Sequence, residues 1–243
     1  MKQLAKQSLE RLGVVAVSTG HGGARYLRHP PASAFEGVLL RLFPDLNGLN
    51  FVQVGANDGV RVDPLRPFLT PYRWSGIMLE PLPYNFAALQ QNCGGNDRVR
   101  LWQAAVDKAP GRRLVYDLRR DIGGLPDWAR GLVSFSRDRV AQATSELGLG
   151  EDAISAVEVE TVTWADVWQA FGARRCDLLV TDTEGHDLAL LRAANLAQHK
   201  PRLVHFEHAC VGTEERLGFY RELIGLGYEL ATDAGDTTAW LRE

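Results

Sequence analysis

The sequence predicts an α/β fold in which a mostly parallel sheet carries helices on both faces. Apolar runs of strand length alternate with segments whose apolar residues recur every three or four positions, a pattern typical of βαβ units. Residues 178–180 form the continuous apolar run Leu-Leu-Val, as expected for a strand buried on both faces of a parallel sheet. A turn containing glycine directly after the first such strand is the third observation.

The first strand is expected over residues 50–54 and runs into a turn that carries Gly55 and Gly59. Glycine has no Cβ, so the backbone of such a turn can approach a ligand closely. We expect a helix after the turn, then a second strand at 75–79 that ends in Glu80. This order is that of an adenosine-binding βαβ unit, in which the turn lies under the cofactor and the acid binds the ribose hydroxyls.

The spacing of the glycines separates two nucleotide chemistries. Dinucleotide folds use G-x-G-x-x-G, whereas this turn reads G-x-x-x-G with Asn57 and Asp58 between the glycines. A negative Asp58 disfavours a pyrophosphate and favours a positively charged cofactor with an amino group, such as S-adenosylmethionine. A tight turn followed by an ordinary exposed acid is the plainer alternative.

Residues before the first strand are expected to form an extension. Residues 1–12 have helical character, and residues 18–31 are rich in Gly and His and predict a loop. Apolar residues at helical spacing predict a helix over 33–43, which either caps the mouth of the site or packs beside the first strand. We therefore divide the chain into an N-terminal helical extension or cap, 1–48, and a main domain, 49–243.

The middle of the chain predicts a helix at 83–92 and a third strand at 99–106. Two further strands are expected at 112–117 and at 156–162, where apolar and polar residues alternate. The insertion 118–155 is long, polar and without a strong period. Such segments are often lids or substrate loops, so we expect this insertion to determine substrate specificity.

The last third of the chain continues the alternation. A helix at 163–171 carries aromatic residues at three- and four-residue spacing, which we assign to the core. The remaining elements are expected at 176–181 (strand), 188–194 (helix), 202–206 (strand), 214–225 (helix), 228–230 (strand) and 238–241 (strand).

Composition excludes several classes of function. Hydrophobic residues make up 45% and charged residues 23% of the chain, as in ordinary globular proteins. The net charge of −3 gives no broad attraction to nucleic acid, and no apolar run approaches the ~20 residues of a membrane span. Cys93, Cys176 and Cys210 form no CxxC pair, which fits a reducing compartment, so we expect a cytoplasmic protein.

Six segments together resemble the FkbM family of S-adenosylmethionine-dependent methyltransferases. They are, in the order in which the family has them, 51–60, 63–65, 74–81, 182–187, 206–208 and 235–237. The resemblance implies a Rossmann-like class I methyltransferase sheet, mostly parallel with an antiparallel last strand. It also implies methyl transfer to a hydroxyl of a sugar or natural product. Gln53 is a departure, because many members carry an acid there.

The resemblance and the glycine turn together indicate a set of cofactor-binding residues. Residues past the third strand border the adenine in such sheets, and the segment around Ser134 resembles an element of the family that lies near the cofactor. The expected residues are Gln53, Gly55, Ala56, Asn57, Asp58, Gly59, Asp63, Glu80, Pro81, Ala105, Val106 and Ser134.

The polar cluster at 182–187 is expected to face the acceptor, because open α/β sheets bind ligands beyond the carboxyl ends of their strands. His186 is our candidate base, since an unperturbed pKa of ~6.5 suits proton abstraction at neutral pH. Asp182 or Glu184 would orient it or bind acceptor hydroxyls. Alternatively, the acids of this cluster are helix N-terminal residues favoured by the helix dipole.

A divalent cation is a further hypothesis. Asp182, Glu207 and His208 follow two strands expected to be neighbours and could converge there. Oxygen ligands suit Mg²⁺, while an imidazole shifts the preference toward Mn²⁺ or Zn²⁺. The alternative is that Glu207 and His208 only form hydrogen bonds with the substrate or the 182–187 loop.

Two other functions stay open from the residues. An NAD- or nucleotide-sugar-binding oxidoreductase would share the βαβ logic, but the glycine spacing and the lack of a Tyr-x-x-x-Lys pair disfavour it. A catalytically silent cofactor-binding module would keep the fold without turnover. The expected partner is a small hydroxylated acceptor and not nucleic acid, and a homodimer is one assembly that the sequence allows.

Overall fold

The computed structural model describes residues 15–18, 24–27, 33–126, 129 and 131–241, and the account below concerns these residues. The helix expected at 1–12 lies outside them. None of the helices they form is long and apolar enough to cross a membrane.

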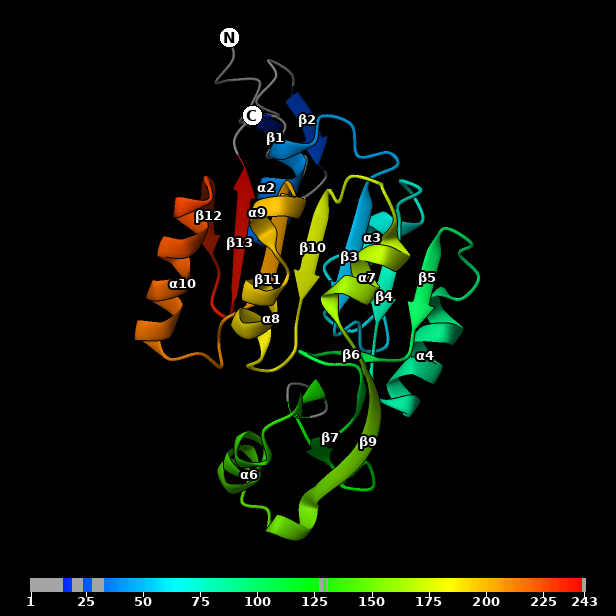
Figure 1. The fold of residues 1–243 in the computed structure, drawn as a ribbon, viewed down its shortest axis with the longest axis vertical. Coiled ribbons are helices and arrows are strands. Elements are labelled where there is room, and N and C mark those ends of the chain that lie inside the picture. The colour runs from blue at the N-terminus through cyan, green and yellow to red at the C-terminus, as the bar shows by residue number, and fades with distance from the viewer. Residues whose placement is uncertain (1–14, 19–23, 28–32, 127–128, 130, 242–243) are drawn as a thin grey trace.

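A seven-stranded sheet forms the centre of the molecule (Figure 1), with the strand order β12-β13-β11-β10-β3-β4-β5. Five neighbouring strands from β11 to β5 run parallel, and β13 pairs antiparallel with both β11 and β12. This confirms the predicted α/β sheet with antiparallel closing strands. The strands are β3 (Asn50–Val54), β4 (Ser75–Leu79), β5 (Val99–Trp102), β10 (Leu178–Thr181), β11 (Leu203–Glu207), β12 (Tyr228–Thr232) and β13 (Asp236–Leu241).

Helices cover both faces of this sheet because successive residues of its buried strands point to opposite sides. Val52 and Val54 of β3 belong to one core cluster, and Phe51 belongs to the other. The first cluster includes residues of α7 (Trp164–Phe171), α8 (Asp187–Ala193), α9 (Leu196–His199) and α10 (Thr213–Gly225). The second includes residues of α2 (Ala34–Leu42), α3 (Arg66–Leu69) and α4 (Pro83–Cys93).

Helix α2 is part of this second core rather than a separate element. Its residues Phe35 and Leu39 are almost completely buried, and they share the cluster with Phe51 of β3. The Phe35 ring also packs against His205 of β11, with 4.9 Å between ring centroids, so the helix lies against this face of the sheet. The division of the chain at residue 48 stays a prediction.

A smaller four-stranded sheet, in the order β6-β9-β7-β8, extends beyond the carboxyl ends of β3 and β10 (Figure 1). Helix α6 packs Val140 and Ala143 into a small core with Leu118 and Leu132. The elements are β6 (Ala105–Val106), β7 (Gly111–Leu118), β8 (Val133–Ser134), α6 (Arg137–Glu146), the 3₁₀-helix η1 (Glu151–Ala153) and β9 (Ile154–Val162).

The insertion 118–155 is therefore not the structureless loop that we expected. Helix α6 begins at a Ser136 cap, whose side chain accepts a hydrogen bond from the Arg139 N–H. Its only buried residues are Val140, Ala143 and Thr144. With so narrow an apolar face, the helical period is too weak to read from the sequence.

Three other expectations on secondary structure were wrong. The strand expected over 99–106 is broken, because β5 and β6 belong to different sheets. The helix expected after the glycine turn shrinks to the four residues of α3, preceded by turns. The predicted loop 18–31 contains β2 (Ala24–Leu27), which pairs antiparallel with β1 (Val15–Ser18).

Candidate active site

A cavity of about 560 Å³ lies at the carboxyl edge of the large sheet, where β3 neighbours both β4 and β10. Open α/β sheets bind their ligands at such a topological switch point. Most residues expected in the site line this cavity: Gln53, Gly55, Ala56, Asn57, Asp63, Glu80, Pro81, Ala105, Val106, Ser134, Asp182, Glu184, His186 and Glu207. Asp58, Gly59 and His208 do not line it.

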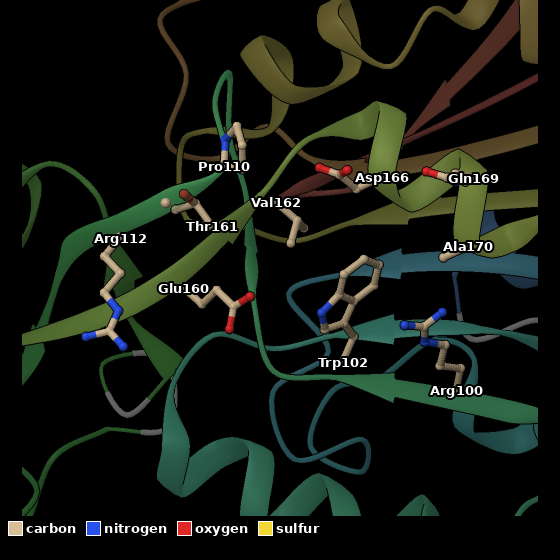
Figure 2. A pocket seen from close by; sticks show the side chains of 11 residues that line it. Arg100, Trp102, Pro110, Arg112, Glu160, Thr161, Val162, Asp166, Gln169 and Ala170 are labelled. Carbon is tan, nitrogen blue, oxygen red and sulfur yellow. The ribbon is translucent and has the colours of Figure 1, made fainter.

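A second, more open groove of about 850 Å³ lies between β5, β9 and α7 (Figure 2). Thr161 and Val162 line this groove and pair with Ala105 and Val106, which line the first cavity. The β6–β9 pair therefore forms a wall shared by the two. None of the residues expected in the site lines the groove, so we assign the chemistry to the first cavity.

The glycine turn after β3 depends on close packing. Gly55 has φ +83°, and a Cβ built on it would lie 1.8 Å from the backbone oxygen of Asp182. Gly59 has φ +70°, and its Cβ would lie 2.6 Å from Leu89 Cδ1. Neither position has room for a side chain. Gly55 lines the cavity, whereas Gly59 packs against α4 and does not line it.

Asp58 also stabilises the turn instead of facing the cavity. Its Oδ1 accepts hydrogen bonds from the Val60 and Arg61 backbone N–H groups at 2.9 and 2.8 Å. Aspartate commonly closes turns in this way. The argument that Asp58 faces a cationic cofactor therefore does not hold.

Glu80 holds the turn from the neighbouring strand. Its side chain is 3% exposed, and its Oε2 accepts a hydrogen bond from the Asn57 N–H at 3.0 Å. Oε1 accepts hydrogen bonds from the Leu82 N–H at 3.0 Å and from Asn85 Nδ2 at 3.4 Å. Burial raises the pKa of Glu80 to about 7, although these hydrogen bonds act in the opposite direction. Glu80 thus fixes the cavity floor and leaves one lone-pair position on Oε2 for a ligand.

Gln53, which is buried, and Asp63, which is partly buried, form a hydrogen-bonded pair on the adjacent wall. Gln53 is 4% exposed and donates a hydrogen bond from Nε2 to Asp63 Oδ1 at 3.2 Å. The same oxygen accepts a hydrogen bond from the Leu65 N–H at 2.8 Å. Gln53 Oε1 and Asp63 Oδ2 are buried without a hydrogen-bond partner among the described residues.

The turn after β10 directs Glu184 and His186 to different places. Glu184 and Gly185 both have left-handed backbone conformations, with φ +54° and +99°. Glu184 Oε2 lies 3.8 Å from Cys210 Sγ, whereas the His186 ring packs edge-on against Phe135 with 5.5 Å between ring centroids. The Glu184 carboxyl group and the His186 imidazole therefore belong to the same wall of the cavity but have different neighbours.

His186 has no hydrogen bond to Asp182 or Glu184 among the described residues, so the expected orientation by these acids is not found. Burial lowers the pKa of His186, and the charge of Asp107 partly offsets this effect. The imidazole is therefore neutral at pH 7, with Asp107 as the nearby negative charge. Asp107 in turn forms an ion pair with Arg113 at 2.5 Å.

Carboxyl groups crowd the ends of β10 and β11. Desolvation, followed by the charges of Asp187 and Glu207, raises the pKa of Asp182 well above its ordinary value. Burial and a neighbouring acid raise the pKa of Glu184 to about 7 and that of Glu207 to about 8. These groups cannot all be ionised at neutral pH, because like charges held together disfavour each other.

A cation reaches this cluster from the small sheet. Arg139 of α6 donates a hydrogen bond from Nη2 to Cys210 Sγ at 2.9 Å, and its charge acts on both Glu184 and Glu207. Burial and the charge of Glu207 raise the pKa of Cys210 to about 12, so the thiol stays protonated. Sequence reasoning missed Arg139 and Cys210, which do not line the cavity but act on its carboxyl groups, because no local pattern marks either of them.

The predicted metal ligands do not come together. His208 is buried, and its Nδ1 lies 2.9 Å from Thr237 Oγ1 instead of facing Asp182. In the described part of the chain, the atoms that could share a cation belong to Glu184, Glu207 and Cys210. A protonated thiol that already accepts a hydrogen bond from a guanidinium is a poor cation ligand.

A parallel sheet with a glycine turn and a cavity at its switch point defines the class of α/β proteins that bind a nucleotide-type cofactor. The chain belongs to the FkbM methyltransferase family, since the model of the methyltransferase FkbM domain matches residues 53–243. It is therefore a methyltransferase, and the family implies S-adenosylmethionine as the methyl donor. No curated protein matches the chain.

Several solved structures are similar to the chain at low identity. Methyltransferase FkbM from Methylobacillus flagellatus KT is 13% identical, with 81% of this chain and 44% of that chain covered and a TM-score of 0.48. Precorrin-6y C5,15-methyltransferase from Geobacter metallireducens GS-15 is also 13% identical, with 84% and 85% covered and a TM-score of 0.41. For the N-terminal domain of human METTL16 the values are 12% identity, 85% and 66% coverage and a TM-score of 0.44. The chain thus spans less than half the length of the M. flagellatus protein.

Proposed function

We propose that the protein transfers a methyl group from S-adenosylmethionine to a hydroxyl oxygen of a sugar or natural-product acceptor. The observation that carries this proposal is the imidazole of His186 in the wall of the same cavity as the glycine turn, with no hydrogen bond to a carboxylate among the described residues. A hydroxyl acceptor must lose a proton when it is methylated, and a positioned neutral imidazole can take that proton.

The residues at the end of β3 fit the cofactor. Gly55 lines the cavity with bare backbone, and buried acceptor atoms of Gln53 and Asp63 lack hydrogen-bond partners among the described residues. Glu80 keeps a lone-pair position available for a ribose hydroxyl. When bound, S-adenosylmethionine supplies a methyl group already activated on a sulfonium. The protein therefore contributes positioning, exclusion of water and proton removal.

The residues beyond β10 and β11 fit a hydroxylated acceptor. His186 accepts the proton of the reacting hydroxyl. The charge of Asp107 favours the imidazolium that forms, while the charges of Arg113 and Lys108 act against it. Glu184 and Glu207, whose pKa values are raised to about 7 and about 8, are partly protonated at neutral pH. They can therefore both donate and accept hydrogen bonds, as recognition of several hydroxyls requires.

The small sheet supplies the third wall of the cavity. Val133, Ser134 and Phe135 line it, and the Phe135 ring contacts His186. Because these residues belong to the insertion 118–155, its proposed role in acceptor specificity keeps a structural basis.

The test is formation of S-adenosylhomocysteine with a panel of hydroxylated sugars and natural products, by the wild type and His186→Gln. We expect the variant to lose about 10²- to 10⁴-fold in kcat while its calorimetric affinity for S-adenosylhomocysteine is unchanged. The matched control is His199→Gln, which changes a histidine stacked on Trp168 at 4.1 Å outside the cavity. Full activity of His186→Gln, or turnover only with amine acceptors, would overturn the proposal.

A further inference from the structure

The second groove, between β5, β9 and α7, is lined by an arginine that lies over a tryptophan (Figure 2). The guanidinium carbon of Arg100 is 4.6 Å from the centroid of the Trp102 ring. Trp102 packs against the core cluster that includes residues of α7, but it is only partly buried, and Arg100 is exposed. The pair therefore presents apolar surface and hydrogen-bond donors side by side.

Three exposed side chains in this groove are open to a ligand, namely Arg100, Glu160 and Gln169. Among the described residues, none of the three side chains has a hydrogen bond or an ion pair. The carboxylate of Glu160 accepts hydrogen bonds, the guanidinium of Arg100 donates them, and the amide of Gln169 does both. This combination suits hydroxyl groups, because a hydroxyl group also donates and accepts.

The other charged side chains of the groove already have partners. Arg112 forms an ion pair with Glu158 at 3.1 Å, and Asp166 Oδ2 accepts the N–H of the residue that caps α7 at 2.8 Å. One guanidinium and one carboxylate, those of Arg100 and Glu160, are therefore left for a ligand. An anionic ligand would meet the carboxylate and a cationic ligand the guanidinium, so a neutral ligand rich in hydroxyl groups fits the groove best.

The segment 107–111 connects this groove with the half of the cavity proposed for the acceptor. At one end of the segment, the charge of Asp107 acts on His186, and at the other end Pro110 and Gly111 line the groove. The wall that the groove and the cavity share is the β6–β9 pair, and neighbouring strands lie about 4.8 Å apart. A ligand made of several linked units can therefore occupy both places at once.

We propose that the groove is a distal subsite, which binds a neutral sugar unit of a glycan acceptor while another unit is methylated in the cavity. The C–H groups of the sugar ring pack against the Arg100–Trp102 pair, and its hydroxyl groups form hydrogen bonds with Glu160 and Gln169. This inference rests on the proposed function. It adds to that function the size and the charge of the acceptor, which is an oligosaccharide or oligoglycoside with neutral units and not a free monosaccharide.

The direct test is binding of fluorescently labelled protein to a glycan array that carries neutral, acidic and amino sugars. We expect the wild type to retain neutral oligosaccharides, and Glu160→Ala and Trp102→Ala each to weaken that binding by about tenfold, the effect of losing one hydrogen-bonding or packing partner. Glu158→Ala is the matched control, because Glu158 is also an exposed glutamate of β9 but does not line the groove. Unfolding temperatures are compared because Trp102 also packs against the core, whereas Glu160 is exposed.

Two results on the array would overturn the inference. One is that the wild type retains no neutral glycan, and the other is that both groove variants retain glycans as well as the wild type does. If Trp102→Ala instead changed the oligomeric state in light scattering and kept its glycan binding, the groove would belong to an interface with a second copy of the chain, and the inference would be wrong.

Kinetics separate this inference from the proposed function. With the retained oligosaccharides as acceptors, we expect Glu160→Ala to raise KM by about tenfold and to leave kcat unchanged, because the groove does not contact the reacting hydroxyl. If glycans bind through the groove but yield no S-adenosylhomocysteine, the proposed function fails and sugar binding by the groove stands. If oligosaccharides are methylated with a KM that Glu160→Ala does not change, the distal subsite alone is wrong.

Discussion

The two halves of the cavity are built in different ways. At the end of β3, polar side chains are held by backbone N–H groups near in sequence, as Glu80 is by Leu82 and Asp63 is by Leu65. At the ends of β10 and β11, carboxyl groups crowd together, and their cation comes from α6 of the small sheet. The comparison teaches that local sequence preorganises the proposed cofactor half, whereas long-range packing assembles the proposed acceptor half.

The largest expected effect tests the packing that joins the two halves. Gly55→Ala would place a methyl group 1.8 Å from the Asp182 backbone oxygen, at a residue with φ +83°. We expect a loss of several kcal/mol of unfolding free energy, about 3 kcal/mol or more, because backbone on both sides must move. Denaturant unfolding measures this loss.

The control for that experiment is Gly95→Ala, since a Cβ at Gly95 meets nothing within 4 Å. It should change stability by about 0.5 kcal/mol or less. Equal effects of the two substitutions would mean that Gly55 does not join the halves by contact.

The next effect concerns only the acceptor half. Arg139→Met removes the cation that donates to Cys210 and acts on Glu184 and Glu207. We expect kcat/KM for the acceptor to fall by about tenfold or more, as for the loss of one charge-assisted hydrogen bond, while the Kd for S-adenosylhomocysteine stays the same. Steady-state kinetics and calorimetry measure the two.

Arg137→Met is the matched control, because Arg137 lies on the same helix and pairs with Glu151 at the surface. It should leave both quantities unchanged. If Arg139→Met weakened cofactor binding as much as acceptor turnover, the two halves would not be independent.

The difference between the two halves of the cavity also decides how much of the candidate site the sequence could predict. Gly55, Glu80 and the polar run after β10 were found because each lies next to its own strand, and the ends of neighbouring parallel strands meet at one edge. Local patterns could not show that α6 forms, since only three of its residues are buried, nor that Arg139 meets Cys210. The predicted metal ligands Asp182, Glu207 and His208 do not come together, because sequence adjacency of Glu207 and His208 does not give the direction of the histidine ring, which faces Thr237.

The smallest effect is a dependence of stability on pH that originates in the acceptor half. The pKa of Glu207 is raised to about 8 by burial and by the neighbouring acids, against an ordinary value near ~4.3 in the unfolded chain. Between these values the unfolded chain releases a proton that the folded protein retains, so the folded protein loses stability as the pH rises from about 5 to 8.

Glu207→Gln removes this loss. We therefore expect its unfolding temperature, relative to wild type, to be about 2–4 °C higher at pH 8.5 than at pH 5, whereas Glu160→Gln, at an exposed residue of the second groove, should show no such change. A difference between Glu207→Gln and wild type that stays constant across this range would mean that the carboxyl groups at the ends of β10 and β11 do not share their protons in the folded protein.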